Sequence, residues 1–315
     1  MRVENLTKKF PVKGGKFLTA CDDITFDVRK GETFGIVGES GCGKTTLLKA
    51  IMNMQPPTSG KIIFRGEDIT QLTGETKRQN YRYIQMVFQD PTAAFNPKMR
   101  IKDIICEPLL NFDLISKSDV EAKARELLTQ VDLPADFVNR YPHNMSGGQR
   151  QRVAIARALA LEPDVIACDE ATSALDVSVQ DTIIKLLVKL QREKGITYIF
   201  ICHDLALVSL FSHSIVVMYL GNLMEKIDGD KLGQARHPYT QALLKAVFST
   251  RQEKNQYIEI LPGDIPSPLN IPSGCPFRNR CLHCQELCSA QKPPFKEISP
   301  NHFVACHYPL EELLH

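Results

Sequence analysis

Short runs of β-branched and aromatic residues alternate along the chain with segments whose apolar residues recur at helical spacing. The apolar runs, which we expect to form strands, read ITFDV, ETFGIVG, PDVIACDE, ITYIFICHD and SIVVMYLG. Helical patterns begin between these runs, at Lys44 and at Val177. This alternation predicts an α/β fold with a mostly parallel sheet covered by helices.

Two segments depart from the alternation. Between Gln89 and Ser146 the sequence is helix-rich, with SDVEAKARELLTQVDL placing apolar residues three and four positions apart. We expect an inserted helical subdomain at about residues 90–158. After about Lys245 the alternation fades, and LPGDIPSPLNIPSG holds four prolines and two glycines in fourteen residues. The predicted boundary separates a main domain, residues 1–245, from a Pro- and Cys-rich C-terminal extension, residues 246–315.

Composition and charge narrow the class of protein. With 315 residues and 43% hydrophobic content, the chain is long enough for a large core and too apolar to be disordered. Lys and Arg number 38 against 36 for Asp and Glu, so no strong field favours nucleic acid or an anionic membrane. The first residues lack the apolar core of a signal peptide, and no stretch approaches the roughly 18 apolar residues that span a bilayer. We therefore expect a cytoplasmic protein.

The octapeptide GESGCGKT, residues 38–45, fits the phosphate-loop pattern G-x-x-x-x-G-K-[ST]. It follows the apolar run FGIV and precedes the helical pattern TTLLKAIM, as that motif requires. Glycines let successive backbone N–H groups face one point, and a helix N-terminus adds partial positive charge there. We predict that phosphate oxygens bind here, with Lys44 on the β- and γ-phosphates and the Thr45 hydroxyl on Mg²⁺. The predicted binding residues are Gly38, Glu39, Ser40, Gly41, Cys42, Gly43, Lys44, Thr45 and Thr46.

The run DVIACDE ends in the carboxylates of Asp169 and Glu170. Asp169 is predicted to hold Mg²⁺ through its water shell. Glu170 is placed to polarise a water for attack on the γ-phosphate, a general-base role worth roughly 10²–10⁴ in rate. Two carboxylates can also merely end a strand and cap its turn, but the phosphate loop earlier in the chain favours the catalytic interpretation.

The segment MSGGQRQRVAIARAL, residues 145–159, supplies a second helix that opens with an anion-binding sequence. With this segment the chain resembles the ABC transporter ATPases. Seven elements follow that family's order: Phe10, the phosphate loop, Gln89 in VFQDP, the SGGQ signature, the Asp169–Glu170 pair, SALD at residues 173–176, and His203 in ICHD. The resemblance implies a P-loop NTPase core of the RecA-like type with an N-terminal antiparallel β subdomain.

The family also implies roles for these residues. Two such subunits form a sandwich, in which Ser146, Gly147, Gly148 and Gln149 of one contact the γ-phosphate held by the other. Phe10 stacks on adenine, a task for which Phe17 competes. Gln89 senses Mg²⁺ and water and is counted with Glu170, Lys44 and His203 as catalytic. His203 holds the γ-phosphate, and Asp176 couples the two sites.

Further strings, among them VFQDPTAAFNPKMRI, HPYTQALLKA and GDIPSPLNIPSGCPFRNRC, resemble the ATP-binding subunits of oligopeptide, dipeptide and nickel importers. This implies a peripheral protein at the cytoplasmic face of the cell membrane. Its partners are then a second homologous ATPase subunit, two transmembrane permease subunits and an extracytoplasmic solute-binding protein, with no nucleic acid. TYIFICHDL and VMYLG are more similar to the second of the paired ATPase subunits, although a homodimer stays open.

Two other functions compete with import. One is a soluble ABC ATPase acting in translation or DNA maintenance, which a single ATPase domain and fewer than sixty residues between Gln89 and Ser146 disfavour. The other is a metal-sensing regulator with a degenerate ATPase, which the intact Lys44 and Glu170 oppose.

Ten cysteines call for an explanation in a reducing compartment. Cys21, Cys42, Cys106, Cys168 and Cys202 lie in or beside apolar runs and are expected to pack as small apolar residues. In the extension, Cys275, Cys281, Cys288 and Cys306 are spaced C-x5-C-x6-C-x17-C, with Cys284 extra. Thiolates binding a metal would supply folding energy to a Pro-rich loop.

The resemblance implies a [4Fe–4S] cluster on these four cysteines. Zinc is the first alternative, with His283, His302 or His307 as substitute ligands. Reduced thiols that merely pack are the second.

Overall fold

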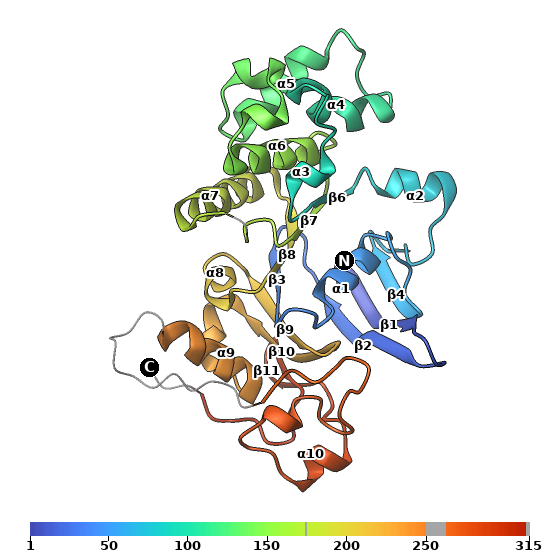
Figure 1. Cartoon of the computed structure of the whole chain (residues 1–315), viewed down its shortest axis with the longest axis vertical. Helices are drawn as coiled ribbons and strands as arrows, with labels where there is room; N and C mark the ends of the chain where they lie inside the picture. Colours follow the sequence, from blue (N-terminus) through green and yellow to red (C-terminus); the bar gives the residue numbers. More distant parts are fainter. Residues whose placement is uncertain (174, 250–262, 313–315) are drawn as a thin grey trace. The chain divides into compact units, whose positions relative to one another are not determined.

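The computed structural model describes residues 1–173, 175–249 and 263–312, and the chain forms two compact units. Unit 1 comprises Met1–Gln71 and Ile201–His315, and unit 2 comprises Leu72–Phe200 (Figure 1). Ala174 of the predicted SALD motif and residues 250–262 and 313–315 of the predicted extension lie outside the described residues. No helix in the described ranges is long and apolar enough to cross a bilayer.

The N-terminal part of unit 1 is an antiparallel sheet, seen in blue in Figure 1. It contains β1 (Arg2–Pro11), β2 (Phe17–Asp27), β4 (Ser59–Phe64) and β5 (Glu67–Asp68), in the order β2-β1-β4-β5. Apolar residues alternate along these strands, so Leu6 of β1 and Ile24 of β2 are paired and fully buried on one face. This sheet also carries Phe10.

A second group of strands in unit 1 has the order β11-β12-β10-β9-β3, in which β11 is Lys296–Ser299 and β12 is His302–Val304. Strands β3 (Thr33–Val37) and β9 (Ser214–Tyr219) are parallel and fully buried, as their apolar runs predict. Strand β10 (Asn222–Asp228) returns antiparallel to β9 because only Leu220 and Gly221, both with positive φ, join the two. A two-residue turn of that kind makes a hairpin. The sheet is therefore mixed rather than mostly parallel at this point.

The described helices of unit 1 are α1 (Lys44–Ile51), α8 (Leu205–Ser209), η3 (Gly229–Gln234), α9 (Pro238–Ser249), η4 (Arg278–Arg280) and α10 (Glu286–Ala290).

Unit 2 combines three strands with a set of helices. Its strand order is β8-β7-β6, with β6 (Ile84–Val87) and β7 (Val165–Asp169) parallel, and β8 (Thr197–Cys202) leads the chain back to unit 1. Helix α7 (Val177–Lys194) begins at the predicted residue. The remaining elements are α2 (Gly74–Asn80), α3 (Pro91–Ala94), α4 (Ile101–Asn111), α5 (Val120–Gln130), η1 (Ala135–Asn139), η2 (Pro142–Asn144) and α6 (Gly147–Leu159).

The helices α4, α5 and α6 pack on one another in Figure 1. Helix α5 occupies the segment in which apolar residues recur every three and four positions, and Ala124, Leu127 and Leu128 are buried. Its polar side carries Arg125 paired with Glu121 at 2.9 Å, one turn away. This division into an apolar and a charged face explains why the helical pattern was readable in the sequence.

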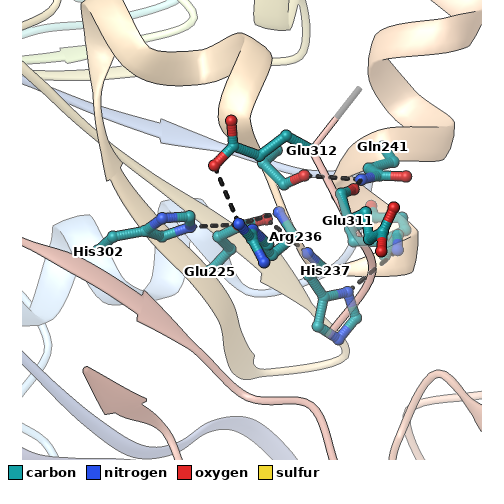
Figure 2. A network of polar contacts seen from close by, with 9 residues as sticks. Glu225, Arg236, His237, Gln241, His302, Glu311 and Glu312 are labelled. Atoms are coloured by element: carbon teal, nitrogen blue, oxygen red, sulfur yellow. Dashed lines mark hydrogen bonds and ion pairs between the residues drawn. The ribbon is translucent and has the colours of Figure 1, made fainter. Parts of the chain in front are cut away.

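Within unit 1, the described part of the C-terminal extension is anchored to the other elements through Glu225 of β10 (Figure 2). This carboxylate is fully buried and accepts hydrogen bonds from the backbone N–H of Arg236 at 2.7 Å and of His237 at 3.1 Å. The Nε2 atom of His302, in β12, lies 2.7 Å from Glu225 Oε1 and forms a hydrogen bond with it. Strand β12 also pairs antiparallel with β10, so residues from the extension continue the sheet.

Candidate functional site

The loop of residues 38–45 joins β3 to α1 and is closely packed by backbone on both sides. Gly38 has φ 152° and Gly43 has φ 108°. A Cβ on Gly38 would lie 2.2 Å from the Met218 carbonyl oxygen, and one on Gly43 would lie 2.0 Å from that of Ala20. Only glycine fits these two positions, so the motif's glycines are required by the fold as well as by a ligand.

Lys44 is the first residue of α1, and its ammonium group points back toward the start of the loop. Its Nζ donates to the carbonyl oxygens of Gly38 at 2.7 Å and Glu39 at 3.0 Å, and the side chain is buried. Thr45 and Thr46 follow in the first turn. A helix N-terminus, a curved Gly-rich backbone and an ammonium group together suit phosphate oxygens, and bound Mg²⁺ would neutralise their charge. The predicted loop residues therefore form one cradle.

Glu39 is held from two sides by residues that were not predicted. Its backbone N–H donates to the Tyr239 hydroxyl at 3.1 Å. Its carboxylate accepts from both terminal nitrogens of Arg280, at 2.7 and 3.1 Å. Tyr239 lies 200 positions and Arg280 241 positions along the chain from Glu39, so no local sequence signal connects them.

In unit 2, Asp169 ends β7 and is 9% exposed, and Glu170 follows with φ 47°. A non-glycine residue in the left-handed region is uncommon, and such strain gathers at functional sites. Gln89 Nε2 donates to Glu170 Oε2 at 3.1 Å. The contact forms because β6 and β7 run in parallel, with Val87 opposite Cys168, so both strands end at one edge. The structure thus brings the predicted Gln89 and Glu170 together.

The signature segment also has the expected local geometry. Ser146 caps α6: its Oγ accepts from the Gln149 N–H at 3.3 Å, and Gln149 Oε1 accepts from the Ser146 N–H at 3.0 Å. A Cβ on Gly148 would lie 2.6 Å from Val179 of α7, and one on Gly147 would lie 3.5 Å from Leu175. Ser146 is exposed at the N-terminus of a thirteen-residue helix, where an anion is stabilised.

The remaining predicted residues lie on strand and helix ends. Phe10 of β1 is half-buried with Lys8 Nζ 5.1 Å from its ring centroid, and Phe17 of β2 is 59% exposed. His203 is exposed directly after β8, and Asp176 is exposed at the N-cap of α7. Their roles stay predictions.

Comparison with known proteins gives this arrangement a family. The profile described as "ABC transporter" matches residues 21–173, and "Oligopeptide/dipeptide transporter, C-terminal region" matches residues 225–288. The oligopeptide transport ATP-binding protein AppF of Bacillus subtilis is 45% identical over 98% of this chain and 96% of its own. OppF of Haemophilus influenzae, also named an oligopeptide transport ATP-binding protein, is 45% identical over 97% and 96%. The chain belongs to the ABC transporter family.

Solved structures agree with this membership. The ATP-binding cassette MJ0796, as a dimer with ADP and Pi in a post-hydrolysis state, is 31% identical with a TM-score of 0.65, covering 72% of this chain and 97% of its own. CbiO1 of Clostridium perfringens, described as part of an ABC transporter complex, is 27% identical with a TM-score of 0.66, covering 79% and 94%. The ABC protein described here therefore has the ABC ATPase cassette fold, with mixed α/β sheets, and is an ATPase.

The predicted [4Fe–4S] cluster is wrong. Cys275, Cys281, Cys288 and Cys306 do line one cavity, but its volume is about 10 Å³, barely the space of one water. Across residues 1–173, 175–249 and 263–312, which include all ten cysteines, no group of three or more His, Cys, Asp or Glu is placed to hold a metal ion. The same finding opposes zinc: of the substitute ligands, His302 bonds Glu225 and His307 bonds the Gln291 carbonyl.

Cys275, Cys288 and Cys306 of this ABC protein are buried instead, whereas Cys284 is exposed. Burial raises the pKa of Cys275 to about 12 and that of Cys306 to about 11, so both are neutral at pH 7. The metal hypothesis assumed that a Pro-rich loop had no other reason to fold. Phe277, 1% exposed, the Glu225–His302 contact and the β10–β12 pairing supply that reason. The five scattered cysteines are buried as predicted.

Replacing Gly43 by alanine should destabilise the protein more than replacing Gly41. Gly43→Ala adds strain at positive φ and a backbone clash, together about 3 kcal/mol or more. Gly41 also has positive φ, 76°, but nothing lies within 4 Å of a Cβ there, so Gly41→Ala should cost about 1 kcal/mol. Urea unfolding measures both, and equal losses would show that the contact with Ala20 is unimportant.

Proposed function

We propose that this chain is the ATP-hydrolysing subunit of an importer for di- or oligopeptides or a related small solute such as nickel chelates. The decisive support is the match of residues 225–288 to the oligopeptide/dipeptide transporter C-terminal region, in a chain that keeps an intact phosphate loop. A soluble ABC ATPase acting in translation or DNA maintenance gains no support from that match.

In the proposed hydrolysis, residues 38–46 bind the phosphates. Lys44 exchanges its two loop carbonyl partners for β- and γ-phosphate oxygens. Thr45, Gln89 and Asp169 would hold Mg²⁺, which would supply positive charge against the developing negative charge on the phosphates. Glu170, oriented by its hydrogen bond from Gln89, accepts a proton from the attacking water. The water oxygen bonds to the γ-phosphorus as the bond from that phosphorus to the bridging oxygen breaks, so ADP leaves with that oxygen.

Other residues complete the proposed nucleotide site. Phe10 stacks on adenine, His203 positions the γ-phosphate and the water, and Asp176 couples two sites in a dimer. The N-terminus of α6, with Ser146, Gly147, Gly148 and Gln149, binds the γ-phosphate held by a second ATPase subunit. That arrangement lets two helix N-termini face one phosphate from opposite sides, which two homologous subunits related by an approximate two-fold axis achieve readily.

The proposed assembly places this subunit peripherally at the cytoplasmic face of the membrane. It pairs with a homologous ATPase subunit, as the second of two different chains, with a self-pair as the alternative. Two permease subunits contact the helical subdomain at about residues 90–158 of the 1–245 ATPase domain, and a solute-binding protein delivers cargo outside. The extension, residues 246–315, remains part of the ATPase subunit. Nucleotide-driven closure of the ATPase pair then moves the permeases.

Uptake of a labelled tripeptide tests the proposal. Cells lacking this chain should lose uptake, because closure and hydrolysis supply the driving force. The wild-type chain and Glu162→Gln should restore uptake, and Glu170→Gln should not. Full tripeptide uptake without this chain would contradict peptide import, and a parallel assay of nickel-chelate uptake would then test the related solute.

A further inference from the structure

The C-terminal extension reaches the phosphate loop through one arginine. Arg280, the last residue of η4, donates from two terminal nitrogens to the two carboxylate oxygens of Glu39 at 2.7 and 3.1 Å. Two parallel hydrogen bonds between a guanidinium and a carboxylate fix orientation as well as distance. Glu39 is the second residue of the loop, directly before Ser40.

This ion pair is shielded from water. The Arg280 side chain is 7% exposed and that of Glu39 is 20% exposed. Ion pairs on the surface contribute little because solvent screens them, whereas a shielded pair holds its geometry and leaves a costly unpaired charge when one partner is removed. The Arg280–Glu39 pair therefore holds its geometry better than the Lys292–Asp22 pair, which is exposed and links the extension to the N-terminal sheet.

An aromatic cluster fixes the arginine. Phe277, three residues before Arg280, packs against Tyr219 and Tyr239 with ring centroids 5.3 and 5.2 Å away. Arg280 Cζ lies 5.9 Å from the centroid of the Tyr219 ring. Tyr239 in turn accepts the Glu39 N–H. The same cluster thus holds both ends of the ion pair.

The main chain of Glu39 also belongs to the cradle. Its carbonyl oxygen accepts from Lys44 Nζ at 3.0 Å, and its N–H is held by Tyr239. A shift of the Glu39 side chain would move the backbone that sets the position of the Lys44 ammonium. Between the enclosed Gly38 and Gly43, a Cβ on Gly41 would meet nothing within 4 Å, so this part of the loop depends on the contacts of Glu39 for its binding conformation.

We propose that Arg280 is a positioning residue for the phosphate loop, through which the C-terminal extension keeps the loop ready for nucleotide phosphates. The extension acts on nucleotide affinity and does not touch the reacting atoms. Once bound, the phosphates order the loop themselves, so the arginine affects binding more than turnover.

Equilibrium binding of Mg-ATP and Mg-ADP to the full chain tests this role. If the loop in Arg280→Ala is competent only a fraction of the time, the dissociation constants of both nucleotides rise together, by about fivefold to tenfold. The KM of the ATPase should rise likewise, while kcat at saturating ATP stays within about twofold. Arg280→Lys keeps the charge but not the paired hydrogen bonds, and its affinity should fall between those of wild type and Arg280→Ala.

Arg278→Ala is the matched control. Arg278 belongs to the same short helix, but it donates to Ser273 and Ser289 within the extension. Its loss should change nucleotide affinity by less than about twofold, since no loop contact is removed. Equal weakening by Arg278→Ala and Arg280→Ala would overturn the proposal, because it would mean general damage to the extension.

A double-mutant cycle isolates the contact. Glu39→Gln should weaken binding about as much as Arg280→Ala, and the double variant should be no weaker than the worse single variant. Additive losses would overturn the proposal, as would an unchanged dissociation constant in Arg280→Ala. If Arg280→Ala does not fold, the nucleotide affinity of Arg280→Lys is measured instead. A wild-type affinity in that variant would refute the positioning role of Arg280.

Discussion

Lys44→Ala is expected to lower ATP hydrolysis by about 10²–10³, the usual cost of removing one preorganised donor from developing phosphate charge. Lys44 Nζ now bonds two carbonyl oxygens of its own loop. It carries the only formal positive charge within residues 38–46, so no neighbour in the cradle replaces it. Nucleotide affinity should fall as well. Steady-state ATPase assays and equilibrium binding of Mg-ATP measure the two effects.

Lys49→Ala is the matched control for Lys44. Lys49 belongs to the same helix but lies in its last turn, where its positive charge interacts with the negative end of the helix dipole and not with the phosphate loop. Its removal should leave ATPase activity within about twofold of wild type, since one half-buried charge near a helix C-terminus contributes little. Retention of activity in Lys44→Ala would contradict the assignment of the loop as the phosphate site.

Glu170→Gln is expected to reduce ATP hydrolysis by about 10²–10⁴ while leaving ATP binding intact. Glutamine keeps the size of the side chain and can still bond Gln89, which now donates to Glu170 Oε2 at 3.1 Å. It cannot accept a proton from water as a base. ATP-bound dimers should therefore accumulate, which size-exclusion chromatography with and without ATP would detect.

Glu162→Gln controls for the loss of a carboxylate beside β7. Glu162 precedes the strand, is exposed and has φ 51°, so it shares the unusual backbone conformation of Glu170 at the other end of β7. Activity should stay within about twofold of wild type, because a charge change at an exposed position is screened. Near-wild-type turnover in Glu170→Gln would show that another group activates the water.

Local features of the site were predictable from the sequence. The phosphate loop and the capping box of Ser146 and Gln149 lie within a few consecutive residues, and their geometry follows from glycine freedom and helix-end hydrogen bonding. The role of Gln89 came only from the family resemblance, which did not predict the Gln89–Glu170 contact. That contact forms because two parallel strands end at one edge.

The spacing of the cysteines in the extension was not sufficient to predict a metal site. Four thiols in a Pro-rich segment suggested a metal because the sequence showed no other source of folding energy. The structure supplies one in the buried Glu225, whose partners Arg236, His237 and His302 come from a turn and from a strand 77 positions away. Burial then keeps Cys275 and Cys306 as neutral thiols.

By itself, the sequence determined the α/β pattern, the phosphate loop, the acidic pair and the signature helix of this ATPase. Each of these depends on residues that are neighbours in the chain, where hydrogen bonding and backbone freedom decide the conformation. Only the tertiary structure decided that the extension continues the β10 sheet and that Arg280 holds Glu39, because these partners are far apart in sequence. Their pairing depends on burial and on aromatic packing between distant residues, which a pattern of neighbouring residues does not predict.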